Sequence, residues 1–187
     1  YMMKRKNFAI VNYGVANYNS IIGTLNQLGQ NYIVTSDKFE LKKSDFIILP
    51  GVGTFPSAKE ELKKLQLINF LKQLIIKGKP TLGICLGMHL LTNSSEEISY
   101  ERGLDLIPGN VKPNHLKKHQ IGWNKVSINK KKSIFSNLDN KFFYFQHSFS
   151  YTGGKSFING HTTFNKKQIP SIIIKKNIVG VQFHPEK

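Results

Sequence analysis

Residues 80–91 read Pro-Thr-Leu-Gly-Ile-Cys-Leu-Gly-Met-His-Leu-Leu and join a short apolar run to a segment with helical spacing. Within them Cys85, the only cysteine of the chain, stands in a Gly-x-Cys-x-Gly turn between an expected strand, Pro80–Ile84, and an expected helix that begins at Leu86. Such a turn is too tight for side chains on either side and presents its central residue at the tip of a sheet. The positive end of the following helix favours a thiolate, and the backbone N–H of Leu86 is placed to stabilise an oxyanion. The pattern predicts a nucleophilic cysteine, with a buried core thiol as the alternative.

His184 is the histidine best placed to serve this cysteine. It follows an apolar strand in Val181–Glu186, and Pro185 keeps it in an extended conformation. Residues two apart in an extended segment point to the same side, so Glu186 can reach His184 and fix its tautomer. A cysteine nucleophile needs such a histidine and orienting group. The alternative is a loop histidine beside a solvated glutamate.

The first half of the chain alternates strands with helices, which predicts an α/β fold with a mostly parallel central sheet and helices on both faces. The expected elements before the cysteine are strands at Phe8–Val11, Tyr32–Val34 and Phe46–Leu49 and amphipathic helices at Asn17–Leu28 and Lys59–Lys77. The second half contains short strand candidates at Val126–Ile128, Phe142–Phe145, Phe157–Ile158, Ile172–Ile174 and Val179–Val181. These extend the sheet as a mixed sheet. No domain boundary is visible, so residues 1–187 are expected to form a single domain.

The composition limits the functional classes. The 187 residues include 27 Lys and Arg against 11 Asp and Glu, a formal net charge of +16. Only Arg5 and Arg102 are arginines, and the lysines are scattered, which argues against a nucleic-acid partner, because arginine is the preferred reader of bases and phosphates. AT-rich codon usage explains the charge, with attraction of an anionic substrate or acidic partner as the alternative. We expect no metal, no cofactor and no membrane segment, and a reducing cytoplasmic location.

Gly83–Met88 together with Val181–Lys187 resembles the class I (triad) glutamine amidotransferases, which release ammonia from glutamine. Further segments, in family order over essentially the whole chain, are similar to the glutaminase subunits of imidazole glycerol phosphate synthases. They are Asn12–Gly14 with Asn17 and Ser20, Leu49–Gly53, Gly103–Leu104 with Ile107–Gly109, Gly122–Asn124 and Tyr144–Ser148. The resemblance implies a flavodoxin-like amidotransferase domain, a histidine-biosynthetic role, and a heterodimer with a β/α-barrel synthase subunit that receives the ammonia.

The resemblance also implies residue roles. Cys85 would attack the glutamine amide, His184 would transfer protons, and Glu186 would orient His184. Val52 or Gly53 would add a second backbone N–H to that of Leu86 in the oxyanion hole. The remaining implied positions are Gly51, Gly87, His89, His147 and Ser148 for substrate binding, and Asn12, Asn17, Trp123 and Lys187 for the partner surface. For Trp123, packing in the core is an equal alternative.

The sequence departs from the family pattern at several positions. The family usually has aspartate at Asn12, glycine at Ala16, a substrate-binding glutamine at His89 and tyrosine at Phe149. It also normally continues beyond Lys187 with a closing segment, so an incomplete C-terminal end is expected. These departures suit an alternative function, in which a paralogous glutaminase supplies ammonia for amidation of a lipopolysaccharide-type surface sugar. A non-catalytic interaction or nucleic-acid-binding protein is a more remote alternative.

Overall fold

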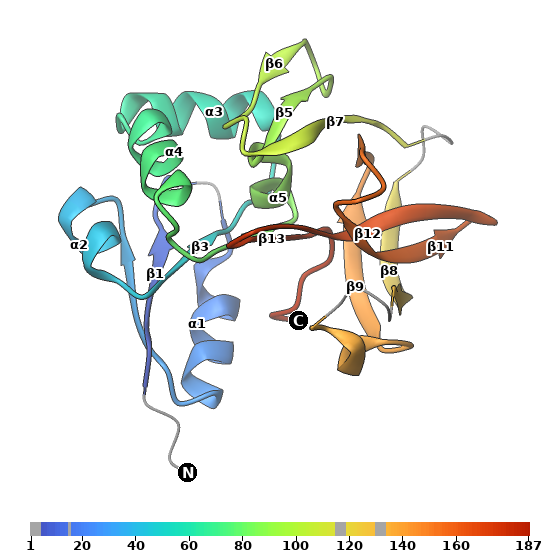
Figure 1. Ribbon diagram of the computed structural model, residues 1–187, viewed down its shortest axis with the longest axis horizontal. Helices are drawn as coiled ribbons and strands as arrows, with labels where there is room; N and C mark the ends of the chain where they lie inside the picture. The colour runs from blue at the N-terminus through green and yellow to red at the C-terminus, as the bar shows by residue number, and fades with distance from the viewer. Residues whose placement is uncertain (1–4, 15, 115–118, 130–133) are drawn as a thin grey trace.

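The computed structural model describes residues 5–14, 16–114, 119–129 and 134–187 (Figure 1). Its main element is a nine-stranded sheet in the order β2-β1-β3-β4-β13-β12-β11-β8-β9. The parallel half consists of β1 (Asn7–Val11), β2 (Asn31–Thr35), β3 (Phe46–Leu49), β4 (Thr81–Ile84) and β13 (Ile178–Val181). The antiparallel half consists of β12 (Lys167–Lys175), β11 (Ile158–Phe164), β8 (Gln120–Ile128) and β9 (Phe142–His147). The predicted mixed sheet is therefore confirmed.

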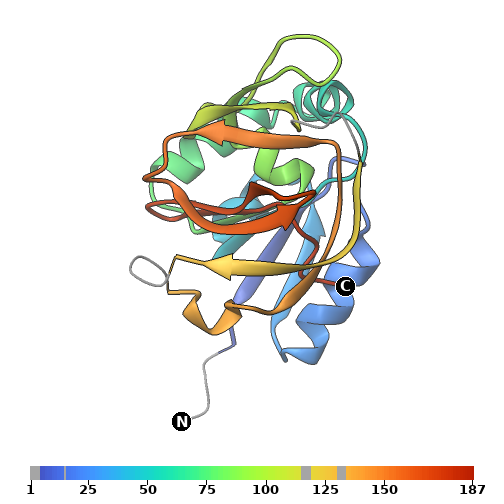
Figure 2. The ribbon, with the colours of Figure 1, turned by 90° about the vertical axis from the view of Figure 1, so that its right-hand side faces the viewer.

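Helices cover both faces of the parallel half, as the alternating pattern predicts (Figure 2). Because successive strand residues point to opposite faces, Ala9 and Val11 belong to one buried cluster and Ile10 to the other. The first cluster contains residues of α2 (Lys38–Lys43), α3 (Phe55–Lys64), α4 (Ile68–Ile76) and α5 (Leu86–Leu90). The second contains residues of α1 (Tyr18–Gln27) and of β8 and β9.

The prediction of a single helix over Lys59–Lys77 is wrong, because α3 and α4 are separate helices. The chain turns at Gln66, whose φ of 54° lies in the left-handed region. The N–H of Gln66 donates to the carbonyl of Lys63, and the N–H of Leu67 donates to the carbonyl of Leu62. This is the Schellman arrangement that ends helices, usually with glycine at the left-handed position. Because no glycine marks this position, the spacing of apolar residues continues from α3 into α4 and predicted one helix.

A second sheet of four strands, in the order β10-β7-β5-β6, has no counterpart among the expected elements. It consists of β5 (Thr92–Ser95), β6 (Glu101–Arg102), β7 (Ile107–Pro113) and β10 (Phe149–Gly153). Ile107 and Tyr151 pack in the same cluster as α5, so this sheet supports the helix that follows the cysteine. The short helix η1 (Ser136–Leu138) precedes β9. No helix among the described residues is long and apolar enough to cross a membrane.

Candidate active site

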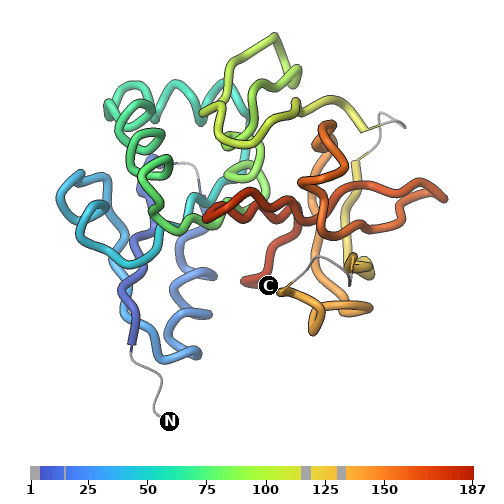
Figure 3. Tube along the Cα trace, viewed as in Figure 1, coloured from blue at the N-terminus to red at the C-terminus, as the bar shows by residue number. Residues whose placement is uncertain are grey.

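Cys85 and His184 meet because their strands are neighbours in the parallel half of the sheet. In the register of β4 and β13, Ile84 lies opposite Val181, and the N–H of Cys85 donates to the carbonyl of Val181 at 2.8 Å. The segments that follow β4 and β13 therefore leave the sheet at the same carboxyl edge, where α/β folds place their ligand-binding and active sites. Figure 3 traces the chain from β13 towards Lys187, and on this path the N–H of His184 donates to the carbonyl of Tyr144 in β9 at 2.9 Å.

The turn at Cys85 has the strained geometry expected of a nucleophile elbow. The residue adopts φ 52° and ψ −108°, a conformation that non-glycine residues seldom adopt. The flanking glycine is required by packing, since a Cβ added at Gly87 would lie 1.8 Å from the carbonyl oxygen of Leu49. The predicted need for glycine in this turn is confirmed. The thiol is buried, with 7% of Cys85 exposed.

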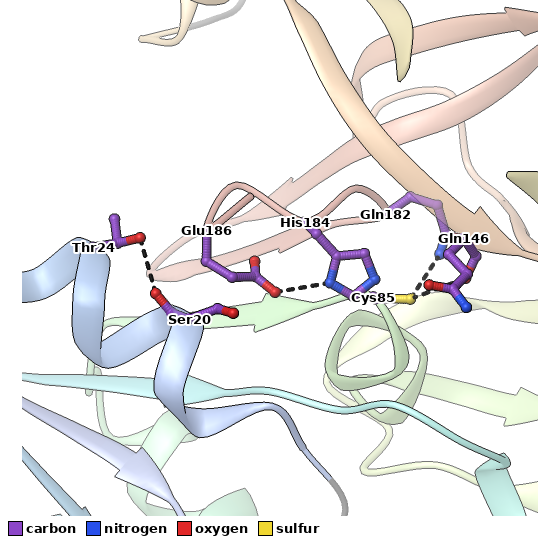
Figure 4. Close-up of polar contacts among 7 residues, drawn as sticks. All are labelled: Ser20, Thr24, Cys85, Gln146, Gln182, His184 and Glu186. Atoms are coloured by element: carbon purple, nitrogen blue, oxygen red, sulfur yellow. Dashed lines mark hydrogen bonds and ion pairs between the residues drawn. The ribbon is translucent and has the colours of Figure 1, made fainter. Parts of the chain in front are cut away.

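His184 lies between Glu186 and Cys85 (Figure 4). Its Nδ1 is 2.9 Å from Oε1 of Glu186, and because a carboxylate accepts, Nδ1 carries the hydrogen. The other ring nitrogen points towards Cys85 (Figure 4). Burial lowers the pKa of His184, but its hydrogen bonds with Cys85 and Glu186 outweigh burial and raise the pKa to about 10. The arrangement can hold an imidazolium beside a thiolate and hand its proton to a leaving group.

A cleft of about 570 Å³ opens over the cysteine, a size suited to a small molecule. Of the residues expected at the site, those that line it are Val52, Gly53, Cys85, Leu86, His89, His147, Ser148 and His184. Gly51 and Gly87 are not among its lining residues. A Cβ at Gly51 would lie 2.6 Å from the hydroxyl of Tyr13, so both glycines serve close packing beneath the cleft.

Two buried histidines at the cleft are held neutral. Burial lowers the pKa of His89 to about 4, although its hydrogen bond with Gln182 acts the other way. Burial also lowers the pKa of His147 to about 3, despite a 2.8 Å hydrogen bond from Nδ1 to the carbonyl of Phe149. Neither ring competes with His184 as a cation near neutral pH.

The structure brings residues to the cleft or to its cysteine that the sequence did not single out. Glu97 reaches it from the segment between β5 and β6, where its carboxylate accepts from the N–H of Phe55 at 2.5 Å. His119 lies 2.5 Å from the hydroxyl of Ser148, measured from its Nδ1. The buried amide of Gln182 lies between Cys85 and His89. The one sequence signal for Glu97 was its place in an acidic pair, Glu96-Glu97, of a strongly basic chain. No spacing pointed to His119 or Gln182.

The four residues expected at a partner surface lie outside the cleft lining. Asn12, Asn17 and Lys187 are exposed. Trp123 is 59% exposed, so the alternative that it packs in the core is wrong. Its ring meets that of Tyr144 edge to face at 5.9 Å, and Nζ of Lys187 lies 5.6 Å from the centroid of the Tyr144 ring.

The fold and the Cys-His-Glu arrangement define a class of enzyme. Residues 9–187 match the family model described as "Glutamine amidotransferase class-I", and the chain belongs to this family of glutamine amidotransferase enzymes. It is 38% identical over 185 residues to the imidazole glycerol phosphate synthase subunit HisH of Lactococcus lactis subsp. lactis, covering 97% of this chain and 92% of that protein. It is 40% identical over 182 residues to the HisH subunit of Bacillus cereus, covering 96% of this chain and 87% of that protein.

Solved structures agree on the fold. A glutamine amidotransferase crystal structure superposes with a TM-score of 0.76 at 15% identity, covering 95% of this chain and 90% of that one. PurLQS from Thermotoga maritima gives a TM-score of 0.74 at 18% identity, covering 98% of this chain and 89% of that chain. The predicted fold class is therefore confirmed.

Proposed function

We propose that the protein is the glutaminase subunit of an imidazole glycerol phosphate synthase and acts in histidine biosynthesis. It hydrolyses glutamine to glutamate and ammonia and delivers the ammonia to its synthase partner, whose lyase reaction consumes it. The observation that carries this proposal is the line of Glu186, His184 and Cys85, of which His184 and Cys85 line one cleft. The similarity to HisH subunits over nearly the whole chain supports the pathway. A thiol that must stay reduced to react fits a cytoplasmic protein.

The reaction follows from the charges of the triad. The Cys85 thiolate attacks the amide carbon of glutamine, and the carbonyl oxygen becomes an oxyanion that the N–H groups of Leu86 and of Val52 or Gly53 stabilise. The imidazolium of His184 gives its proton to the departing nitrogen, the carbon–nitrogen bond breaks, and ammonia leaves a thioester. His184 then takes a proton from water, whose oxygen attacks the thioester. The thioester bond breaks, glutamate is released and the Cys85 thiolate is regenerated, while Glu186 holds the imidazole throughout.

The cleft offers groups for the two ends of the substrate. His89, His147 and Ser148 line it, while Gly51 and Gly87 allow the close packing next to Leu86 and Cys85. Burial raises the pKa of Glu97, although the N–H of Phe55 acts the other way. We assign this carboxylate to the α-ammonium group of glutamine, because opposite charges pair most strongly where water is scarce.

The cluster formed by exposed Trp123 and Lys187 around half-buried Tyr144 is assigned to the synthase partner, together with Asn12 and Asn17. An aromatic ring flanked by a cation is typical of interface centres. The partner is a β/α-barrel subunit, and the heterodimer would seal the cleft so that ammonia passes through the barrel without reaching solvent.

A second ammonia acceptor, a surface sugar, is favoured by His89, which stands where the family usually has glutamine and is committed to an internal hydrogen bond with Gln182. The glutaminase chemistry is the same in both cases. Only the partner and the acceptor differ.

Glutamine hydrolysis with purified partner and acceptor tests the proposal. We expect glutamate to form, and Cys85→Ala and His184→Ala to lower turnover by about 1,000-fold or more. His161→Ala is the matched control, because His161 is half-buried in β11 and does not line the cleft. Unchanged turnover in Cys85→Ala would overturn the mechanism. Ammonia transfer to a sugar nucleotide in place of the phosphoribosyl acceptor would assign the second function.

A further inference from the structure

Gln182 presents a fully buried amide to the nucleophile. Its side chain is 0% exposed, with Nε2 3.8 Å from Sγ of Cys85 and Oε1 2.8 Å from Nε2 of His89. Figure 4 shows Gln182 and His184 approaching the sulfur from different sides. A buried amide that is satisfied at both ends has its orientation fixed by its partners.

His89 and Cys85 contact opposite ends of the Gln182 amide. Its ring is neutral near pH 7, since burial lowers its pKa to about 4. An amide oxygen only accepts, so Nε2 of His89 carries the hydrogen and donates to Oε1 of Gln182. The amide N–H then points at Cys85. A flipped amide would turn its oxygen towards the thiolate and would require the other tautomer of His89.

We propose that Gln182 is a further catalytic residue whose amide N–H stabilises the Cys85 thiolate, and that His89 is a positioning residue that holds this amide in the donating orientation. The inference rests on the proposed function, which requires a thiolate nucleophile. A donor gains more from a charged acceptor than from a neutral one, so the contact favours the thiolate over the thiol. Two groups then favour the thiolate, the His184 cation and the Gln182 amide, and they act against the carbonyl of Gln146, which lies 3.9 Å from the sulfur and accepts from the thiol.

Three titratable groups near the sulfur keep their charge between pH 5 and pH 9. Burial raises the pKa of Tyr13 well above its usual value, so this phenol stays neutral. His147 stays neutral because burial lowers its pKa to about 3. His184 stays charged, since its contacts with Cys85 and Glu186 outweigh burial and raise its pKa to about 10. The titration of these three groups therefore does not shape the reactivity of the thiol in this pH range.

Alkylation with iodoacetamide between pH 5 and pH 9, followed by intact mass, measures this reactivity at one site, because Cys85 is the only cysteine. Gln182→Met keeps the length of the side chain and removes its donor. We expect the midpoint of alkylation to rise by about one pH unit, with about tenfold slower reaction at neutral pH. Gln182→Glu, which places an oxygen against the sulfur, should shift the midpoint at least as far. Gln73→Met, the same change at an exposed position of α4, should shift nothing.

The second pair of variants tests the role of His89. His89→Phe keeps a ring and removes the donor to Oε1 of Gln182, so the alkylation midpoint should rise by less than in Gln182→Met. His89→Gln retains an amide donor, so its midpoint should lie between those of the wild type and His89→Phe. If Gln182→Met does not fold, as judged by circular dichroism, His89→Phe decides the outcome. Unchanged midpoints in the folded variants would overturn the proposal. The assay needs neither glutamine nor partner, so wild-type protein that fails to hydrolyse glutamine would overturn the proposed function instead.

Discussion

Replacing Gly87 with alanine tests whether the close approach of α5 to β3 holds the nucleophile in place. The added Cβ would lie 1.8 Å from the carbonyl oxygen and 2.7 Å from the carbonyl carbon of Leu49. Both are backbone atoms, which a change of rotamer cannot move. Cβ contacts below 3.0 Å are essentially never observed, so α5 and β3 must separate by about 1.2 Å or more.

The size of the effect follows from this displacement. Overpacking of a tight contact costs about 1–3 kcal/mol, and in a chain of this length each kcal/mol shifts Tm by about 2–4 °C, so Tm should fall by roughly 2–12 °C. Cys85 and Leu86 lie at the start of the displaced helix. A misplacement of about 1 Å at a reacting group lowers turnover by about 100-fold, which we expect for glutamine hydrolysis.

Calorimetry and a coupled glutamate assay with the synthase partner measure both effects, and Gly23→Ala supplies the matched control. A Cβ at Gly23, in the interior of α1, meets nothing within 4 Å. Alanine there should stabilise the helix by about 0.5–1 kcal/mol, raising Tm by roughly 1–4 °C without changing turnover. Wild-type Tm and turnover in Gly87→Ala would refute the reasoning.

Two further predictions concern the triad and the partner surface. The pKa of His184 is raised in the fold from 6.5 to about 10, so the stabilisation is complete below pH 6.5 and is lost as the pH rises through about 10. Urea unfolding should therefore show a falling free energy between these pH values and a shallower fall in Glu186→Gln; an equal slope in both proteins would contradict the assignment. Trp123→Ala, which removes a 59% exposed ring, should weaken partner binding by about tenfold in calorimetric titration with Tm unchanged. Phe39→Ala, at a 68% exposed ring on α2, is its control and should bind as the wild type does; equal losses in both would count against the surface.

The sequence predicted the parts of the fold in which one local signal dominates. The apolar runs that became β1, β3, β4 and β13 are short and bounded by turn residues, and residues 83–87 revealed the elbow. The break at Gln66 was missed because glutamine there adopts a conformation usually given to glycine. Thr92–Ser95 forms a strand through tertiary packing although its residues are polar, and Thr92 and Ser95 are fully buried. Glu97 follows that strand, so its position at the cleft could not be predicted while the strand itself was missed.

The same packing builds the fold and aligns the site. Gly83 in β4 lies opposite Gly180 in β13, and a Cβ at Gly180 would lie 2.7 Å from Cγ of Met88, on α5. Small residues on both strands therefore let α5 rest directly on the sheet, which fixes Cys85 at the start of α5 against the strand that leads to His184. A strand advances about 3.3 Å per residue, so a register slip of two residues between β4 and β13 would shift the histidine by about 7 Å along the strand relative to the thiol. Gly83, which the sequence indicates as part of a tight turn, and Gly180 thus also set the distance between Cys85 and His184.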